Sequence, residues 1–202
     1  PLISYVILQA KCRNCKTNIA FRYFLVELLT ALCFLGIFYL YGVTITTLML
    51  IILSIFFVII FFIDLDHFII PNELTFPLMI IGFLKSFDPN INLDLFPSYI
   101  ESLLGGVFGY ILIWSIITLY MKIRKKEGMG LGDAKLLAAI GFWFGWYSIP
   151  YVIFLSSLSA LLIALPSLIN KSKSMSSQIP FGPYLIFGTV AYLILRNYFV
   201  FI

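Results

Sequence analysis

Long apolar stretches alternate with short polar segments along almost the whole chain of 202 residues. A membrane-spanning helix needs about 20 mostly apolar residues, and several of these stretches are long enough. The pattern predicts an all-α fold, a polytopic bundle of about seven transmembrane helices. Their predicted ranges are 21–41, 45–63, 72–86, 99–121, 133–148, 150–169 and 183–202.

Two of the predicted helices, 72–86 and 133–148, are short for a full crossing. Both start at a motif that contains an aspartate. Irregular structure at membrane depth is tolerated where it is buried in protein or lines a water-filled cavity. We therefore expect both short helices to lie within the bundle, beside such a cavity.

The composition supports a membrane protein and excludes a soluble enzyme. Hydrophobic residues make up 62% of the chain and charged residues 11%, and the mean hydropathy is +1.07. A soluble domain has roughly 45–50% apolar and about 25% charged residues. The lipid bilayer is therefore the first predicted partner of this chain.

Lysine and arginine residues gather on one side of the predicted topology. That side carries Lys11, Arg13, Lys16, Arg22, Lys122, Arg124, Lys125, Lys126, Lys171 and Lys173. On the other side only Lys85 and Arg196 lie near a membrane edge. Because cytoplasmic loops are enriched in Lys and Arg, the basic side is predicted to face the cytoplasm. The net charge of +4 therefore needs no nucleic-acid partner to explain it.

Two aspartates lie at the ends of very apolar stretches, on this same predicted cytoplasmic side. Asp64 closes the run 56–63, and Asp133 lies in the segment Gly130-Leu131-Gly132-Asp133-Ala134-Lys135. An ionisable residue at the membrane edge costs free energy and by default indicates a functional site. We predict that Asp64 and Asp133 are partners in one site.

Other interpretations of the first aspartate segment remain open. Residues 64–72 also have the pattern of a polar turn, with Pro71 and Asn72 at the start of the next helix. Asp64 and Asp66 form a DxD pair, which suits a divalent cation, although no third acidic ligand is near in sequence. Asp66 fits the polar turn better than Asp64 does, because Asp64 directly follows the apolar run.

Glycines at positions 128, 130 and 132 precede Asp133. A flexible hinge is one interpretation, whereas a phosphate-binding loop is excluded because no strand precedes the glycines and no Gly-Lys-Ser/Thr follows them. Glycines at a helix start allow backbone conformations that are closed to other residues, and they allow a peptide or a second helix to approach closely. We therefore expect Gly130 and Gly132 to support the site at Asp133.

Cys12 and Cys15 form a lone CxxC. It is interpreted as a redox pair, as half of a metal site or as a chance occurrence. A reducing cytoplasm disfavours a structural disulfide, and zinc needs four ligands, of which two are present. Cys33 is predicted to be a small residue within a span. Glu27 lies about a turn into the first predicted helix, where a buried functional position and a position near the cytoplasmic interface both fit the sequence.

Together these motifs resemble those of the bacterial type IV prepilin peptidases, also called leader peptidase/N-methyltransferases. The resemblance rests on Asp-x-Asp-x-x-x-x-Pro-Asn at 64–72, Gly-x-Gly-Asp-x-Lys-Leu at 130–136, Ile-Pro-Phe-Gly-Pro at 179–183, Val-Glu-Leu at 26–28 and CxxC at 12–15. It extends over nearly the whole chain in the same order. The combination is more specific than Gly-x-Gly-Asp alone, which preflagellin peptidases and presenilin-like proteases share.

The resemblance implies an aspartic endopeptidase of the GxGD type in the bacterial inner membrane. Such an enzyme removes the basic leader from prepilins or pseudopilins at the cytoplasmic face, for type IV pili or type II secretion. Asp64 and Asp133 match the catalytic acids. The residues that we predict to support this site or to bind substrate are Asp66, Gly130, Gly132, Lys135 and Glu27.

Proteolysis by two carboxyl groups needs no metal. For longer family members the resemblance implies S-adenosylmethionine, for methylation of the new N-terminus, and zinc bound by two CxxC pairs, of which Cys12 and Cys15 would be half. The chain starts at Pro1 and lacks the family's first helix. We expect that its beginning is missing, so that 1–20 is the remnant of a cytoplasmic CxxC loop and 21–202 is the transmembrane peptidase domain.

Two alternatives from other classes stay open. A small membrane transporter with a carboxylate pair is the first alternative. A transporter site is expected near the membrane midplane, often between inverted repeats, whereas both acids fall on one side and the two halves of the chain show no inverted repeat. A non-catalytic subunit of a secretion or competence machine is the second alternative. Cleavage of a prepilin distinguishes the peptidase from both.

Overall fold

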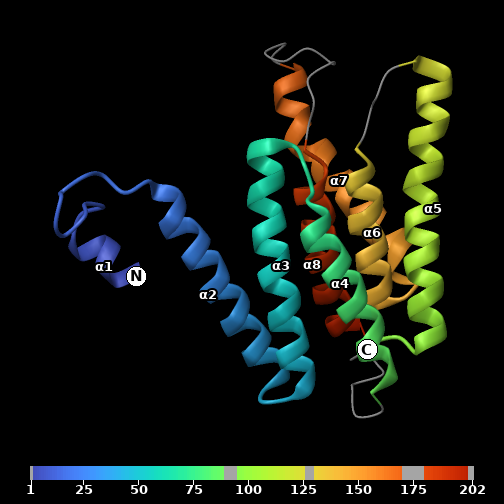
Figure 1. Cartoon of the computed structure of the whole chain (residues 1–202), viewed down its shortest axis with the longest axis horizontal. Coiled ribbons are helices and arrows are strands. Elements are labelled where there is room, and N and C mark those ends of the chain that lie inside the picture. The colour runs from blue at the N-terminus through green and yellow to red at the C-terminus, as the bar shows by residue number, and fades with distance from the viewer. Residues whose placement is uncertain (1, 89–94, 126–129, 170–179, 200–202) are drawn as a thin grey trace. The chain divides into compact units, whose positions relative to one another are not determined.

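The structure is a computed structural model that describes residues 2–88, 95–125, 130–169 and 180–199. Within these ranges the chain folds into α-helices, with one 3₁₀ turn and one isolated β-bridge between Lys11 and Asn18 (Figure 1). The predicted all-α fold is therefore confirmed for the described residues. The chain divides into two compact units, Pro1–Val58 and Ile59–Ile202.

The helices of the first unit are α1 (Leu2–Ile7), α2 (Phe21–Tyr41) and the first part of α3 (Ile45–His67). The ring of Tyr5 packs on that of Phe24, with 5.2 Å between the centroids, and so joins α1 to α2. Gly42 ends α2 with a φ of +61°, in the left-handed region that favours glycine. The hydroxyl of Thr44 then accepts the N–H of Thr47 at 3.2 Å and caps the start of α3.

The end of α3 differs from the prediction. The sequence pattern placed the helix end at residue 63, before the first charged residue, but α3 continues to His67. The carbonyl of Asp64 still accepts a helical hydrogen bond, from the N–H of Phe68 at 3.0 Å. Phe68 has a φ of +56°, which is rare for a bulky residue and turns the chain away from the helix. Asp64 therefore lies inside the last turn of α3 and not after it.

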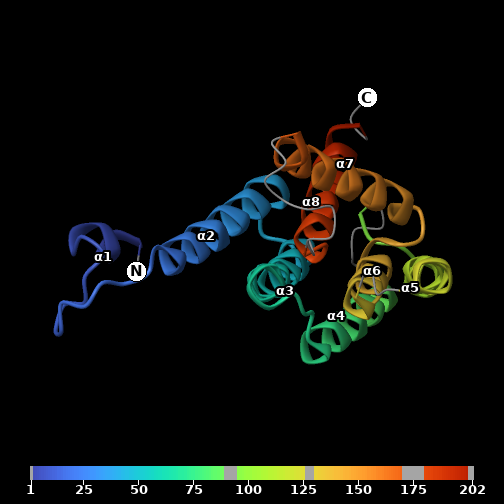
Figure 2. The same ribbon diagram turned by 90° about the horizontal axis from the view of Figure 1, so that it is seen from above.

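The second unit starts with the end of α3. Its further elements are α4 (Asn72–Leu84), η1 (Lys85–Phe87), α5 (Tyr99–Arg124), α6 (Leu131–Phe144), α7 (Ser148–Ile169) and α8 (Gly182–Phe199). Figures 1 and 2 show α6 between α5 and α4, and α7 packed against α8. Each of the seven predicted ranges corresponds to one helix from α2 to α8, with ends shifted by up to four residues.

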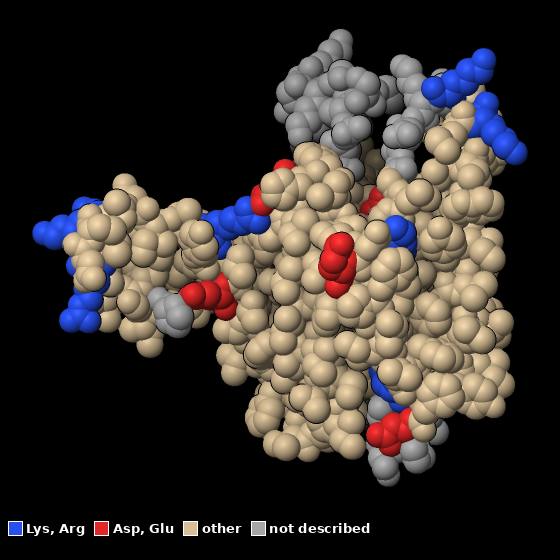
Figure 3. All heavy atoms as spheres, viewed as in Figure 1, with Lys and Arg blue, Asp and Glu red and all other residues tan. Residues whose placement is uncertain are grey.

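Four helices of the described part have the length and apolar composition to cross a membrane. They are Phe21–Tyr41, Ile45–His67, Tyr99–Ile123 and Ser148–Leu165. Helices α4 and α6 have 13 and 14 residues and are short, as predicted. In Figure 3 most of the visible face of the second unit is uncharged, and only a few charged side chains stand on it. The chain is therefore a multi-pass membrane protein.

Glycines allow the short helix α6 to lie at the centre of its unit. Gly141 of α6 faces Gly105 of α5 so closely that a side chain on either would collide with the backbone of the other helix. The hydroxyl of Ser102 on α5 also donates a hydrogen bond of 2.6 Å to the carbonyl of Phe142. On the other side, the indole N–H of Trp143 donates to the carbonyl of Leu78 in α4 at 2.8 Å. Helix α6 is thus held from two sides, and most of its side chains are buried.

Lys85 and Arg196, the two basic residues predicted near the less basic membrane edge, contact backbone carbonyls and an aromatic ring. Lys85 is buried, donates a hydrogen bond of 2.8 Å to the carbonyl of Trp143, and lies 3.9 Å from the ring centroid of Phe96. Arg196 donates to the carbonyl of Leu95 at 3.2 Å. These contacts fasten the start of the segment 95–98 to the helices. Of the cations predicted on the basic side, Lys126, Lys171 and Lys173 lie outside the described residues.

Candidate functional site

The structure brings the two predicted partner aspartates together in the second unit. Asp64 lies in the last turn of α3 and Asp133 in the first turn of α6. Their side chains are buried, with 4% and 7% of their surface exposed, and the charge of Asp64 acts on the carboxyl group of Asp133. Two like charges in such surroundings favour a state in which the pair shares a single proton.

A third helix end reaches this site. The backbone N–H of Gly182, the first residue of α8, donates a hydrogen bond of 3.0 Å to Oδ2 of Asp64. A helix start carries partial positive charge, which suits a carboxylate. In the sequence, Gly182 stood out only as part of the Ile-Pro-Phe-Gly-Pro motif. Ile179 of that motif lies outside the described residues.

Ile70, in the loop between α3 and α4, lies against both α6 and α8. A Cβ placed on Gly132 would lie 3.0 Å from Cβ of Ile70, and one placed on Gly182 would lie 3.1 Å from Cδ1 of Ile70. Because Gly132 and Gly182 have no side chain, there is room for Ile70 between them. No periodicity in the sequence marks Ile70 as a contact residue, because the contact joins three segments that are far apart along the chain.

The prediction for the glycines before Asp133 is only partly correct. Gly130 has a φ of −80° and precedes the helix, and Gly132 is helical, so neither adopts a backbone conformation closed to other residues. The predicted close approach occurs at Gly132, where Ile70 packs, whereas a Cβ on Gly130 would meet nothing nearer than the backbone nitrogen of Gly132 at 3.8 Å. Gly128 lies outside the described residues.

Lys135 joins the two aspartate motifs. Its Nζ donates a hydrogen bond of 2.6 Å to Oδ1 of Asn72, the first residue of α4, and lies 5.8 Å from the ring centroid of Phe76. Asn72 ends the first motif and Lys135 belongs to the second, so this bond ties the start of α4 to the first turns of α6. The sequence pattern identified Asn72 as a helix-starting residue and missed this contact.

The remaining predicted residues lie in different surroundings. Asp66 is exposed in the last turn of α3, in contrast to the buried Asp64. Glu27 is half-buried in α2 and belongs to the first unit, not to the unit that holds the aspartates. Its role, like that of Asp66, remains a prediction.

The CxxC segment forms a tight turn in the first unit. The N–H of Cys12 donates to the carbonyl of Thr17 at 2.9 Å, and Sγ of Cys15 lies 3.0 Å from the Thr17 hydroxyl. Hydrogen bonds from the side chain and backbone of Thr17 lower the pKa of the exposed Cys15 thiol to about 7. No group of three or more His, Cys, Asp or Glu residues suited to a metal occurs among the described residues. Two thiols do not complete the four-ligand set of structural zinc, so the described residues do not fit that metal by themselves.

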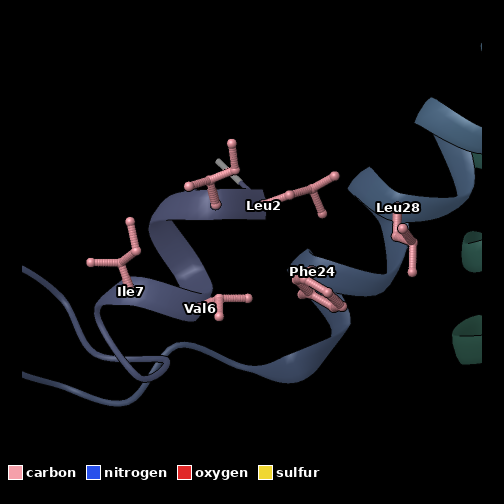
Figure 4. Close-up of a pocket in the computed structure, with 6 residues that line it drawn as sticks. Leu2, Val6, Ile7, Phe24 and Leu28 are labelled. Atoms are coloured by element: carbon pink, nitrogen blue, oxygen red, sulfur yellow. The ribbon is translucent and has the colours of Figure 1, made fainter.

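A pocket of about 310 Å³ lies between α1 and α2 (Figure 4). It is lined by Leu2, Ile3, Val6, Ile7, Phe24 and Leu28. All six side chains are aliphatic or aromatic, and none can transfer a proton or bind a charged group. This pocket is therefore no candidate for a catalytic site.

The fold and the site define a class of protein, a multi-pass membrane helix bundle with a buried pair of aspartates. The model of the type IV leader peptidase family matches residues 51–165, which include both aspartates. The bacterial Peptidase A24 N-terminal domain matches residues 1–41. The chain belongs to the type IV leader peptidase family.

Curated relatives include proteins named prepilin leader peptidase/N-methyltransferase. The relatives from Aeromonas hydrophila and Pseudomonas aeruginosa are each 39% identical over 194 residues, which is 96% of this chain and 65% of theirs. The relative from Neisseria gonorrhoeae is 37% identical over 185 residues, 92% of this chain and 62% of its own. The chain thus spans slightly less than two thirds of their length. No solved structure matches it.

Proposed function

We propose that this chain is a membrane aspartic endopeptidase of the GxGD type that cleaves the basic leader from type IV prepilins or pseudopilins. One observation carries the proposal. Asp64 and Asp133, which are 69 residues apart in the sequence, lie buried at helix ends that meet around Ile70 and Gly182. Family membership and the names of the relatives supply the substrate class.

The proposed reaction uses one ionised and one protonated carboxyl group. The ionised carboxylate takes a proton from water as the water oxygen bonds to the scissile carbonyl carbon, and the protonated carboxyl gives its proton to the carbonyl oxygen. The tetrahedral intermediate then returns that proton, the C–N bond breaks, and the leaving amine takes the proton that came from water. No net proton is consumed within the pair, and no metal enters any step.

The orientation belongs to the proposal as well. The chain would lie in a bacterial inner membrane with about seven crossings, the four long apolar helices among them. The end that carries Asp64, Asp133 and the start of α8 would face the cytoplasm, on the side where most lysines and arginines lie. The apolar part of the substrate would then enter among the helices while its basic leader stays in the cytoplasm.

Methylation of the new N-terminus, with S-adenosylmethionine as the methyl donor, would follow cleavage in a protein of the relatives' full length. The relatives' names contain this second activity. Glu27, Asp66 and Lys135 are proposed to support cleavage or to bind substrate, and Cys12 with Cys15 to form half of a zinc site in such a longer protein.

The test is incubation of the purified, detergent-solubilised chain with a prepilin, followed by mass spectrometry of the substrate. The proposal predicts a product shortened by its leader, formed by the unmodified chain and not by Asp133→Asn. A carboxylate-pair transporter or a non-catalytic assembly subunit would leave the prepilin at its full mass. Intact prepilin after incubation with well-folded protein would therefore contradict the proposal.

A further inference from the structure

We propose that Gly182 is a positioning residue for cleavage, because its N–H holds one oxygen of Asp64 and its missing side chain leaves room for that carboxylate. The inference rests on the proposed function and goes beyond it, since it assigns a role in the reaction to the start of α8. In this assignment Oδ2 of Asp64 is held by the protein, and the other oxygen, Oδ1, is left to give or take a proton in the reaction.

The first argument is the hydrogen bond. The N–H of Gly182 reaches Oδ2 of Asp64 at 3.0 Å, and the bond is buried. It joins residues 118 positions apart, so it fixes the end of α3 against the start of α8. A bond from a fixed backbone donor restricts the rotation of the carboxyl group, and such pre-orientation is what acid and base groups need for efficient catalysis.

The second argument is space. A Cβ on Gly182 would lie 2.6 Å from Oδ2 of Asp64 and 3.2 Å from its Cγ. The described glycines with a left-handed backbone are Gly42 and Gly145, so conformation does not explain the glycine at position 182. A larger residue there is excluded by the carboxylate and, to a smaller extent, by Cδ1 of Ile70 at 3.1 Å.

Helix α8 contains a second crowded glycine that serves as a matched control. A Cβ on Gly188 would collide with the hydroxyl of Ser156 and would lie 2.8 Å from the carbonyl of Val152, both in α7. Gly188 thus belongs to the α7–α8 contact and touches neither aspartate in the structure. An alanine at either position crowds α8, but only the alanine at position 182 displaces a proposed catalytic group.

The kinetic experiment compares Gly182→Ala with Gly188→Ala in prepilin cleavage, with rates expressed per folded protein. For Gly182→Ala we expect kcat to fall by roughly 10- to 100-fold with KM unchanged. A displacement of the catalytic carboxyl group by about 1 Å is enough to lower the rate about 100-fold. For Gly188→Ala we expect a lower thermal midpoint and an unchanged kcat. A kcat of Gly182→Ala equal to that of the unmodified chain would overturn the inference.

A double variant separates the two neighbours of Gly182. Ile70→Val removes Cδ1, so it relieves the contact of an alanine at position 182 with Ile70 but not its contact with Asp64. We expect kcat of the double variant to stay as low as that of Gly182→Ala. Recovery of kcat would show that the glycine accommodates Ile70 and not the carboxylate.

A spectroscopic measurement keeps the inference testable if Gly182→Ala does not fold. Labelling with ¹³C-carbonyl phenylalanine and ¹⁵N-glycine selects, in NMR, only glycines that follow phenylalanine, namely Gly109, Gly145, Gly182 and Gly188. We expect Asp64→Asn to shift one of these four amide proton signals strongly and to leave the others in place. Four unshifted signals would show that no glycine N–H of this set bonds to the Asp64 carboxylate.

The outcomes distinguish this inference from the proposed function. If Asp64→Asn still cleaves prepilin, the catalytic role of Asp64 fails, whatever Gly182 does. If Asp64→Asn is inactive while Gly182→Ala keeps full kcat, only the role of Gly182 fails.

Discussion

The two glycines before Asp133 should respond differently to substitution, although both belong to the Gly-x-Gly-Asp motif. A Cβ on Gly132 would lie 3.0 Å from Cβ of Ile70. This contact is tighter than the usual carbon–carbon contact of about 3.5–4.0 Å, so one of the two sides must give by a few tenths of an ångström. Either the Ile70 loop or the start of α6 must move by that distance. Since Asp133 follows Gly132 directly, the movement reaches the site.

The expected effect of Gly132→Ala is mainly catalytic. A displacement of about 1 Å costs about 100-fold in rate, so this smaller shift should lower kcat by roughly 3- to 10-fold. Overpacking costs about 1–3 kcal/mol of stability, and the gain from replacing a helical glycine by alanine offsets about 0.5–1 kcal/mol of it. The net loss in stability should therefore stay below about 3 kcal/mol, so that most of the protein remains folded.

The assay is prepilin cleavage with kcat and KM measured per folded protein, and Gly130→Ala is its control. A Cβ on Gly130 would meet nothing closer than 3.8 Å, so Gly130→Ala should keep the kcat of the unmodified chain. An equal fall in kcat for both variants, or a fall for Gly130→Ala alone, would refute the reasoning from Ile70.

Three further predictions concern contacts outside the aspartate pair. Asn72→Ala removes the acceptor of Lys135 and should lower the free energy of unfolding in detergent by about 1 kcal/mol; an unchanged thermal midpoint would contradict this. Lys85→Met leaves the buried carbonyl of Trp143 without its donor and should lower the free energy of unfolding by about 1–3 kcal/mol. The value of kcat per folded protein should stay constant, because this contact lies at the end of α6 far from Asp133. A fall in kcat would contradict this. The rate of alkylation of Cys15 should have a pH midpoint near 7, because its thiolate forms above a pKa of about 7, and Thr17→Val should move this midpoint upward. Tryptic cleavage between the two cysteines followed by peptide mass spectrometry measures the rate for Cys15 alone. An unmoved midpoint would exclude Thr17 as the cause of the lowered pKa.

The fold was largely predictable because each helix that crosses a membrane needs a long apolar run in the sequence. Helix α2 occupies the predicted range, and α4 and α6 are short, as their apolar runs indicated. The end of α3 was missed because hydrophobicity stops at Asp64, whereas helical hydrogen bonding continues to Phe68. Apolar length predicts where the membrane ends, and hydrogen bonds determine where the helix ends.

The site was predictable only in part. Counting crossings placed Asp64 and Asp133 on one side, and in the structure both are buried at helix ends of the second unit. The hydrogen bond from Gly182 and the packing of Ile70 were not predictable, because both depend on how helix ends meet in three dimensions. Gly182 stood in a recognisable motif, and that motif was the only sequence signal that pointed to it.

The central claim is that Asp64 and Asp133 form one catalytic pair, and cleavage by three asparagine variants tests it most directly. Asp64→Asn and Asp133→Asn should each lower the rate by at least about 100-fold, the usual contribution of an acid or base group, with normal membrane insertion and helix content. Asp66→Asn, which changes an exposed carboxylate two residues from Asp64, should have a milder effect. Cleavage at the unmodified rate by either buried-aspartate variant, or equal loss in all three, would contradict the account.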